Sequence, residues 1–102
     1  MAQFDIYRNS RKRRYPLLLD IQDDLLSPLP TRVVVPLTTL QRYGARPITR
    51  LNPTVVVDGT DYVAVFQELA AVPASVLRKP VGSLSEQRAD FIGAIDLLFT
   101  GI

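Results

Sequence analysis

The spacing of apolar residues changes near residue 83, and this change constrains the fold more than any other feature. Before that point, apolar residues form short runs separated by prolines, glycines and charged turns, which is typical of β-strands. From Ser85 onward they recur at the spacing of an amphipathic helix. The 102 residues therefore predict one domain, residues 1–102, that is mainly β with one C-terminal α-helix.

Several short segments predict the strands of an antiparallel barrel or sheet. Residues 3–9 alternate, with Phe4 and Ile6 on one side of a half-buried strand. Further strands are predicted at residues 15–21 and at residues 32–37, the latter ending at Pro36. Residues 55–57 and 62–66 flank Asp58-Gly59, which predicts a hairpin because glycine accepts the positive φ of such turns.

Two loops and a helix start are predicted between and after these strands. Residues 22–31 contain two prolines and predict a loop with Leu25 and Leu26 on a surface excursion. Residues 67–82 predict a second loop, with a short extended piece at residues 75–77. Ser83 and Glu86 fit a capping box, in which the Ser83 side chain accepts from the Glu86 amide and Glu86 reaches back.

The composition restricts the chemistry of the protein. The absence of cysteine and histidine excludes disulfides, thiolate metal sites and a cysteine nucleophile, and it removes the usual general base. We therefore expect no cofactor and no metal, and an enzyme is disfavoured. The first residues lack the pattern of a signal peptide and no apolar run approaches the length of about 20 residues that spans a membrane, which favours a cytoplasmic protein without a membrane partner.

The order and spacing of short motifs over the whole chain resemble the CcdB family, whose fold is the SH3-like barrel of CcdB/MazF-like toxins. These motifs are Gln3-Phe4, Tyr7, Arg14-Tyr15, Asp20-Ile21-Gln22, Val35-Pro36-Leu37, Val72-Pro73, Leu84-Ser85 and the closing Ala94-Ile95-Asp96-Leu97-Leu98-Phe99-Thr100-Gly101-Ile102. The resemblance implies a homodimeric toxin of a type II toxin–antitoxin system that binds the A subunit of DNA gyrase and traps the cleaved gyrase–DNA complex. It also implies a CcdA-like antitoxin, which neutralises the toxin and represses the operon together with it, so operator DNA is expected only as a partner of that complex.

The same resemblance implies which residues bind gyrase. They lie in the early loop and at the end of the helix, at Leu25, Leu26, Asp96, Thr100, Gly101 and Ile102. Two of them depart from the best-known form of the family, which has Trp at the position of Thr100 and Asn at the position of Asp96. The Trp-to-Thr difference removes a large aromatic side chain, the residue type that most often dominates interface energy.

Structural alternatives remain open for these residues. Gly101 followed by an apolar residue is also a common helix C-cap, and the two leucines are equally compatible with packing under the loop. The apolar stripe of the helix predicts either core or dimer interface at Phe91, Ile95, Leu98 and Phe99. The basic run predicts either a solvated turn or an electrostatic patch for antitoxin or operator DNA, at Arg8, Arg11, Lys12, Arg13 and Arg14.

Two other functions compete with gyrase inhibition. A MazF-like endoribonuclease would need a base for the 2′-hydroxyl and cations for the phosphate, and the sequence offers Arg13, Arg14, Asp20, Asp23 and Asp24. A CcdB-like protein that binds antitoxin but has lost toxicity would keep the fold and the dimer, and Thr100 is compatible with this alternative too.

Overall fold

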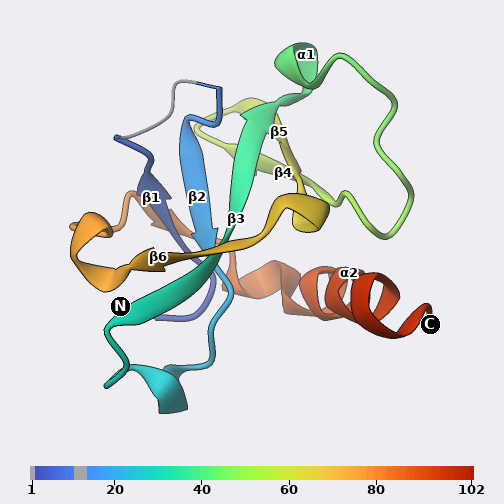
Figure 1. Ribbon diagram of the computed structural model, residues 1–102. Helices are drawn as coiled ribbons and strands as arrows, with labels where there is room; N and C mark the ends of the chain where they lie inside the picture. Colours follow the sequence, from blue (N-terminus) through green and yellow to red (C-terminus); the bar gives the residue numbers. More distant parts are fainter. Residues whose placement is uncertain (1, 11–13) are drawn as a thin grey trace.

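The computed structural model describes residues 2–10 and 14–102, and these residues form a nearly closed antiparallel barrel with a helix at its C-terminal end (Figure 1). The strands are β1 (Asp5–Arg8), β2 (Leu17–Asp20), β3 (Thr31–Thr39), β4 (Thr54–Val57), β5 (Thr60–Ala64), β6 (Ala70–Pro73) and β7 (Gly82–Ser83). The helices are α1 (Leu40–Tyr43) and α2 (Arg88–Thr100), and 3-10 turns are η1 (Asp24–Leu26), η2 (Phe66–Glu68), η3 (Ala74–Val76) and η4 (Ser85–Gln87). The predicted fold class is confirmed.

The strand order in the sheet is β4-β5-β3-β2-β1-β7, and β6 pairs with β3 outside this path. Strand β3 is central because it pairs with three other strands. One edge pairs with β2, while the other is shared between β6, opposite residues 31–34, and β5, opposite residues 37–39. The prediction that this strand ends at Pro36 is wrong. The Pro36 carbonyl accepts from the Val65 amide at 3.0 Å, so the missing N–H of Pro36 faces the gap between β6 and β5, where no strand ladder needs it.

The main core lies between the barrel and α2. Phe91 and Ala94 of α2 are fully buried, and the Phe91 ring lies 5.3 Å from Phe4 and 6.0 Å from Phe66, measured between centroids. Phe4 and Ile6 share this core as predicted, but β1 is buried on both faces. Tyr7 packs in a second, smaller core whose other members are Leu18, Val34 and Leu77.

The hairpin prediction is confirmed, whereas residues 67–82 contain more structure than predicted. Asp58 and Gly59 both have positive φ and connect β4 to β5. The predicted second loop includes β6, and residues 74–76 form η3 rather than an extended piece. The first loop, residues 22–31, is found as predicted and contains η1.

The predicted capping box is wrong. The Ser83 hydroxyl accepts from the Ser85 amide at 3.3 Å rather than from Glu86, because Ser83 belongs to β7 and pairs with Asp5. The chain then passes through η4, and α2 begins at Arg88 without a side-chain cap. In the part of the chain that the structure describes, none of the helices is long and apolar enough to cross a membrane.

Candidate functional site

The second half of α2 runs away from the barrel to the C-terminus (Figure 1), and exposed apolar side chains lie at its end. Of the predicted apolar stripe, Phe91 is core, and Ile95 packs partly buried against it. Leu98 is half-buried, while the side chains of Phe99 and Ile102 are 67% and 78% exposed. Phe99 is therefore not a core residue, and its assignment to a dimer interface stays a prediction.

The last residues of the chain are tied to the helix end by a compact set of hydrogen bonds. Gly101 has a positive φ of 75° and its amide donates to the Leu97 carbonyl at 3.1 Å, which confirms the C-cap interpretation. The Thr100 hydroxyl donates to the Asp96 carbonyl at 2.6 Å and accepts from the Ile102 amide at 3.4 Å. The main chain is thus held while the Ile102 side chain points away from any core.

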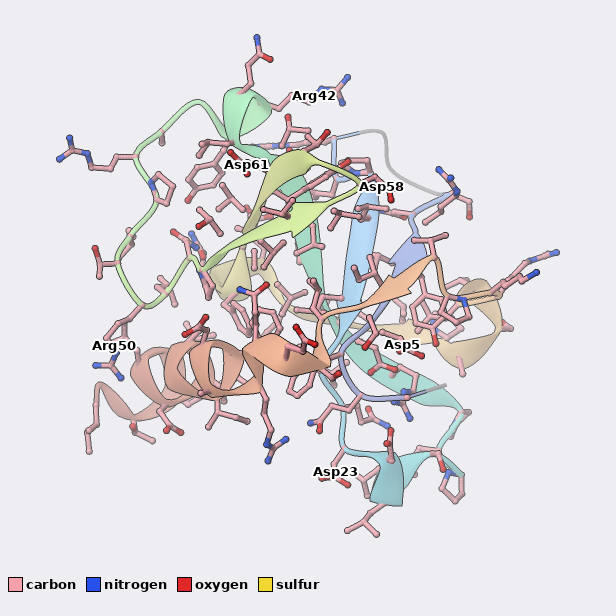
Figure 2. The ribbon with its side chains drawn as sticks, turned by 180° about the vertical axis from the view of Figure 1, so that it is seen from behind. Asp5, Asp23, Arg42, Arg50, Asp58 and Asp61 are labelled. Atoms are coloured by element: carbon pink, nitrogen blue, oxygen red, sulfur yellow. The ribbon has the colours of Figure 1, made fainter. Side chains whose placement is uncertain are left out.

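The loop at η1 presents a second group of exposed apolar side chains. Leu25 is 87% and Leu26 49% exposed, so the alternative that these leucines pack under the loop is wrong. The turn is held by polar groups: Asp23 accepts from the Leu25 amide at 2.8 Å, and Asp24 accepts from the Gln3 amide at 2.8 Å. Figure 2 shows Asp23 at the foot of the molecule, on this turn.

The two predicted gyrase-binding groups do not meet within one chain. Figure 1 shows η1 and the end of α2 at separate places on the lower side of the molecule, with the barrel above them. Each group is nevertheless exposed and apolar. Any single partner that contacts both must span the region between them.

A buried ion pair was missed by the sequence-based predictions. Arg32 donates to Asp20 from Nε at 3.0 Å and from Nη2 at 2.6 Å, and it also donates to the Gln22 carbonyl. Burial raises the pKa of the Asp20 carboxyl, and the hydrogen bond from Arg32 opposes that shift. The signal in the sequence was the alternation in β3, which places Arg32 on the same face as the buried Val34.

Among the described ribonuclease candidates, Asp20 and Asp24 both contact Arg32, at 2.6 Å and 3.7 Å, but Arg14 does not join them. Asp20 is fully buried and bonded to Arg32, so its carboxylate is not free to act as a base. Arg14 precedes β2 and lies at the opposite end of that strand, near Thr38. Asp23 and Asp24 serve the η1 turn, and Arg13 lies outside the described residues.

Arg8, at the start of the basic run, lines a groove that adds two cations to the predicted patch. Arg8 is exposed at the end of β1, and the exposed Arg14 lies 5.5 Å from the centroid of the Tyr15 ring; the predictions for Arg11, Lys12 and Arg13 fall outside the described residues. The groove has a volume of about 570 Å³ and is lined by Tyr7, Arg8, Ser10, Val76, Arg78, Lys79, Pro80 and Val81. Arg78 and Lys79 were not predicted, because they lie in the segment assigned to a loop.

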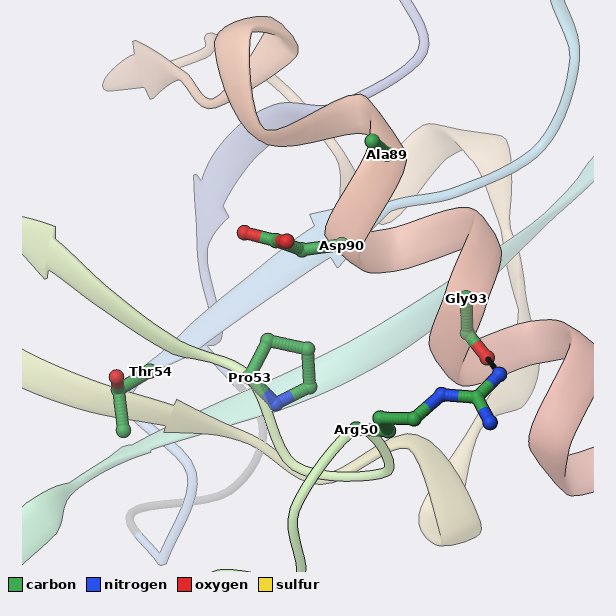
Figure 3. A pocket seen from close by; sticks show the side chains of 6 residues that line it. All are labelled: Arg50, Pro53, Thr54, Ala89, Asp90 and Gly93. Carbon is green, nitrogen blue, oxygen red and sulfur yellow. Dashed lines mark hydrogen bonds between the residues drawn. The ribbon is translucent and has the colours of Figure 1, made fainter.

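A second depression, of about 320 Å³, lies between α2 and residues 50–54 and is lined by Arg50, Pro53, Thr54, Ala89, Asp90 and Gly93 (Figure 3). Arg50 donates to the Gly93 carbonyl at 3.5 Å across it. It contains none of the predicted site residues. Among residues 2–10 and 14–102 there is no group of His, Cys, Asp or Glu arranged to hold a metal ion.

The family model described as "CcdB protein" matches residues 3–101, which is nearly the whole chain. The match includes Leu25, Leu26 and the helix α2, and it ends one residue before Ile102.

Proposed function

This chain belongs to the CcdB family of gyrase-targeting toxins, and from that premise we propose that it binds the A subunit of DNA gyrase and traps the cleaved gyrase–DNA complex. In this role it acts as an inhibitor and not as an enzyme. The observation that carries the proposal is the family match together with the exposed apolar side chain of Ile102 at the end of α2. A soluble domain that leaves large apolar side chains at one projecting end offers them to a partner.

We assign the main gyrase contact to the end of α2, at Asp96, Thr100, Gly101 and Ile102. An interface commonly depends on a few large side chains near its centre. Thr100 is small and hydrogen-bonded to its own helix. Ile102 is therefore the large apolar side chain among these four residues that gyrase can contact. Leu25 and Leu26 form the second contact.

We further propose that the protein acts as a homodimer. The half-buried Ile95 and Leu98 and the exposed Phe99 leave an apolar strip on α2 that the barrel does not cover. A two-fold symmetric contact is the commonest way to bury such a strip. The dimer would act in the cytoplasm, where gyrase works on the chromosome.

The basic groove supports a role in antitoxin binding. The groove is lined both by cations, Arg8, Arg78 and Lys79, and by the apolar Val76 and Val81. This combination fits an acidic segment with apolar side chains. Complementary charge accelerates association of such partners. We propose this groove and the basic turn as the surface for a CcdA-like antitoxin, and operator DNA as a ligand of the resulting complex.

One assay separates the candidate functions. Purified protein is incubated with gyrase, ATP and plasmid DNA, and in parallel with RNA. We expect linear DNA that depends on gyrase, and intact RNA. RNA cleavage would support the MazF-like alternative, and antitoxin binding without linear DNA would identify a protein that has lost toxicity.

A further inference from the structure

The loop that carries Leu25 and Leu26 is closed by one side chain, that of Gln22. Its Nε2 atom donates to the Leu26 carbonyl at 3.3 Å and to the Thr31 carbonyl at 3.2 Å. Its Oε1 atom accepts from the Val33 amide at 3.0 Å. A single amide therefore joins the start of the loop, its tip and the strand that follows it.

Gln22 is itself anchored on the buried ion pair. The backbone amide of Gln22 donates to the Asp20 carboxylate at 3.1 Å, and its backbone carbonyl accepts from Arg32 at 3.2 Å. Both of these side chains are inaccessible to solvent, and Gln22 is only 8% exposed. The Gln22 side chain is thus held in place at the base of the loop, although the loop itself lies on the surface.

A second set of contacts holds the turn from the other side. The backbone amide of Gln3 donates to Asp24. The side chain of Gln3 donates to the Ile21 carbonyl at 3.1 Å and accepts from Arg88 at 3.1 Å. Arg88 is the first residue of α2. The turn is therefore fixed relative to both β2 and the helix.

Apolar contacts do not explain the conformation of this turn. No residue of η1 is buried, and Leu29, which follows in the loop, is also exposed. An exposed apolar turn without core contacts would sample many conformations unless hydrogen bonds restrict it. Its order comes from hydrogen bonds, made by the side chains of Gln22, Asp23 and Asp24 and by Gln3.

We propose that Gln22 is a positioning residue that keeps Leu25 and Leu26 in the conformation in which gyrase binds them. This inference depends on the proposed function, because it deepens the role of the leucine turn. A surface that is already ordered avoids the entropy loss of ordering on binding. Loss of the Gln22 hydrogen bonds lowers the fraction of molecules whose leucine turn is in the conformation that binds gyrase. The apparent affinity for gyrase falls by the same factor.

The test is a double-mutant cycle on binding to the gyrase A protein, measured with the full chain. Gln22→Met removes the hydrogen bonds at similar size, and the combined Leu25→Ala and Leu26→Ala change removes the contacts. Gln41→Met, at an exposed glutamine of α1, is the matched control. We expect Gln22→Met to raise the Kd about tenfold in the natural chain and less than about twofold in the leucine-free chain, and Gln41→Met to change nothing.

Amide exchange provides the second readout. The Leu26 and Leu29 amides donate within the turn to Asp23 and Leu26, and their exchange should accelerate in Gln22→Met but not in Gln41→Met. If Gln22→Met does not fold, Gln22→Glu, which keeps the acceptor for the Val33 amide and loses the donor to Leu26 and Thr31, enters the same cycle. Equal loss in both backgrounds, or no loss in the natural chain, overturns the positioning role. If the leucine change alone leaves binding intact, the leucine contact in the proposed function fails as well.

Discussion

Arg32 donates two hydrogen bonds to a single carboxylate oxygen of Asp20, and both side chains are almost completely buried, at 1% and 0% exposure. Removing one partner of a buried ion pair leaves an uncompensated charge in the interior. We therefore predict that Asp20→Asn lowers the free energy of unfolding by about 3–5 kcal/mol. Urea unfolding at neutral pH measures this change.

The control for that prediction removes both charges. Nη1 of Arg32 has no hydrogen-bond partner among the described residues, so the pair is incompletely satisfied. An apolar pair, Asp20→Leu with Arg32→Met, should recover much of the lost stability. If Asp20→Asn lowers the free energy of unfolding by less than about 1 kcal/mol, another group must compensate the buried charge of Arg32.

The protein should be a homodimer with a mass near twice 11.4 kDa in light scattering at concentrations on the order of tens of micromolar. Phe99→Ser should shift the mass toward the monomer, because it removes exposed apolar surface from α2. Val56→Ser changes a similarly exposed apolar residue of β4 and should leave the mass at that of the dimer. A monomer mass for the natural chain would contradict the dimer.

Replacing Arg11, Lys12, Arg13 and Arg14 with Ser or Gln should slow antitoxin association most at low salt. Long-range attraction accelerates encounter but contributes little to folding, so thermal unfolding should stay nearly unchanged. Stopped-flow association at several ionic strengths measures the effect, with Arg46→Gln as the control at an exposed arginine elsewhere. An association rate that does not respond to the substitutions would exclude the basic turn from the interface.

Restoring an aromatic side chain at the helix end should strengthen gyrase binding. Thr100→Trp supplies the type of residue that contributes about 2 kcal/mol or more at an interface centre, roughly a 30-fold change in Kd. Thr100→Ser keeps the hydroxyl that bonds to Asp96 and Ile102 and should leave the affinity near its natural value. Equal affinities for all three chains would mean that gyrase does not contact position 100.

The features that were predicted correctly depend on local sequence, and those that were missed depend on pairing between distant segments. Asp58-Gly59 specified its hairpin because two positive φ values are needed within two residues. The capping box failed because Ser83 pairs with Asp5, far away in the chain. Strand β6 was missed because its pairing with β3, and not its own pattern, makes it a strand.

The candidate site follows the same division. The apolar residues of the helix tip and the leucine turn were identified by resemblance and are exposed as a binding role requires. Arg32 and Gln22 went unassigned, because their roles exist only where β2, β3 and the loop meet. For Arg32, the available signal was a charge at the start of a strand, two residues before the buried Val34.

The central claim, that the end of α2 poisons gyrase, is tested most directly by deleting Gly101 and Ile102. Few hydrogen bonds depend on these residues, and losing a cap costs only about 1 kcal/mol. Circular dichroism and dimer mass should therefore match the natural chain, while gyrase-dependent linear plasmid DNA disappears. If the truncated protein folds normally and still produces linear DNA, the end of α2 is not the gyrase contact.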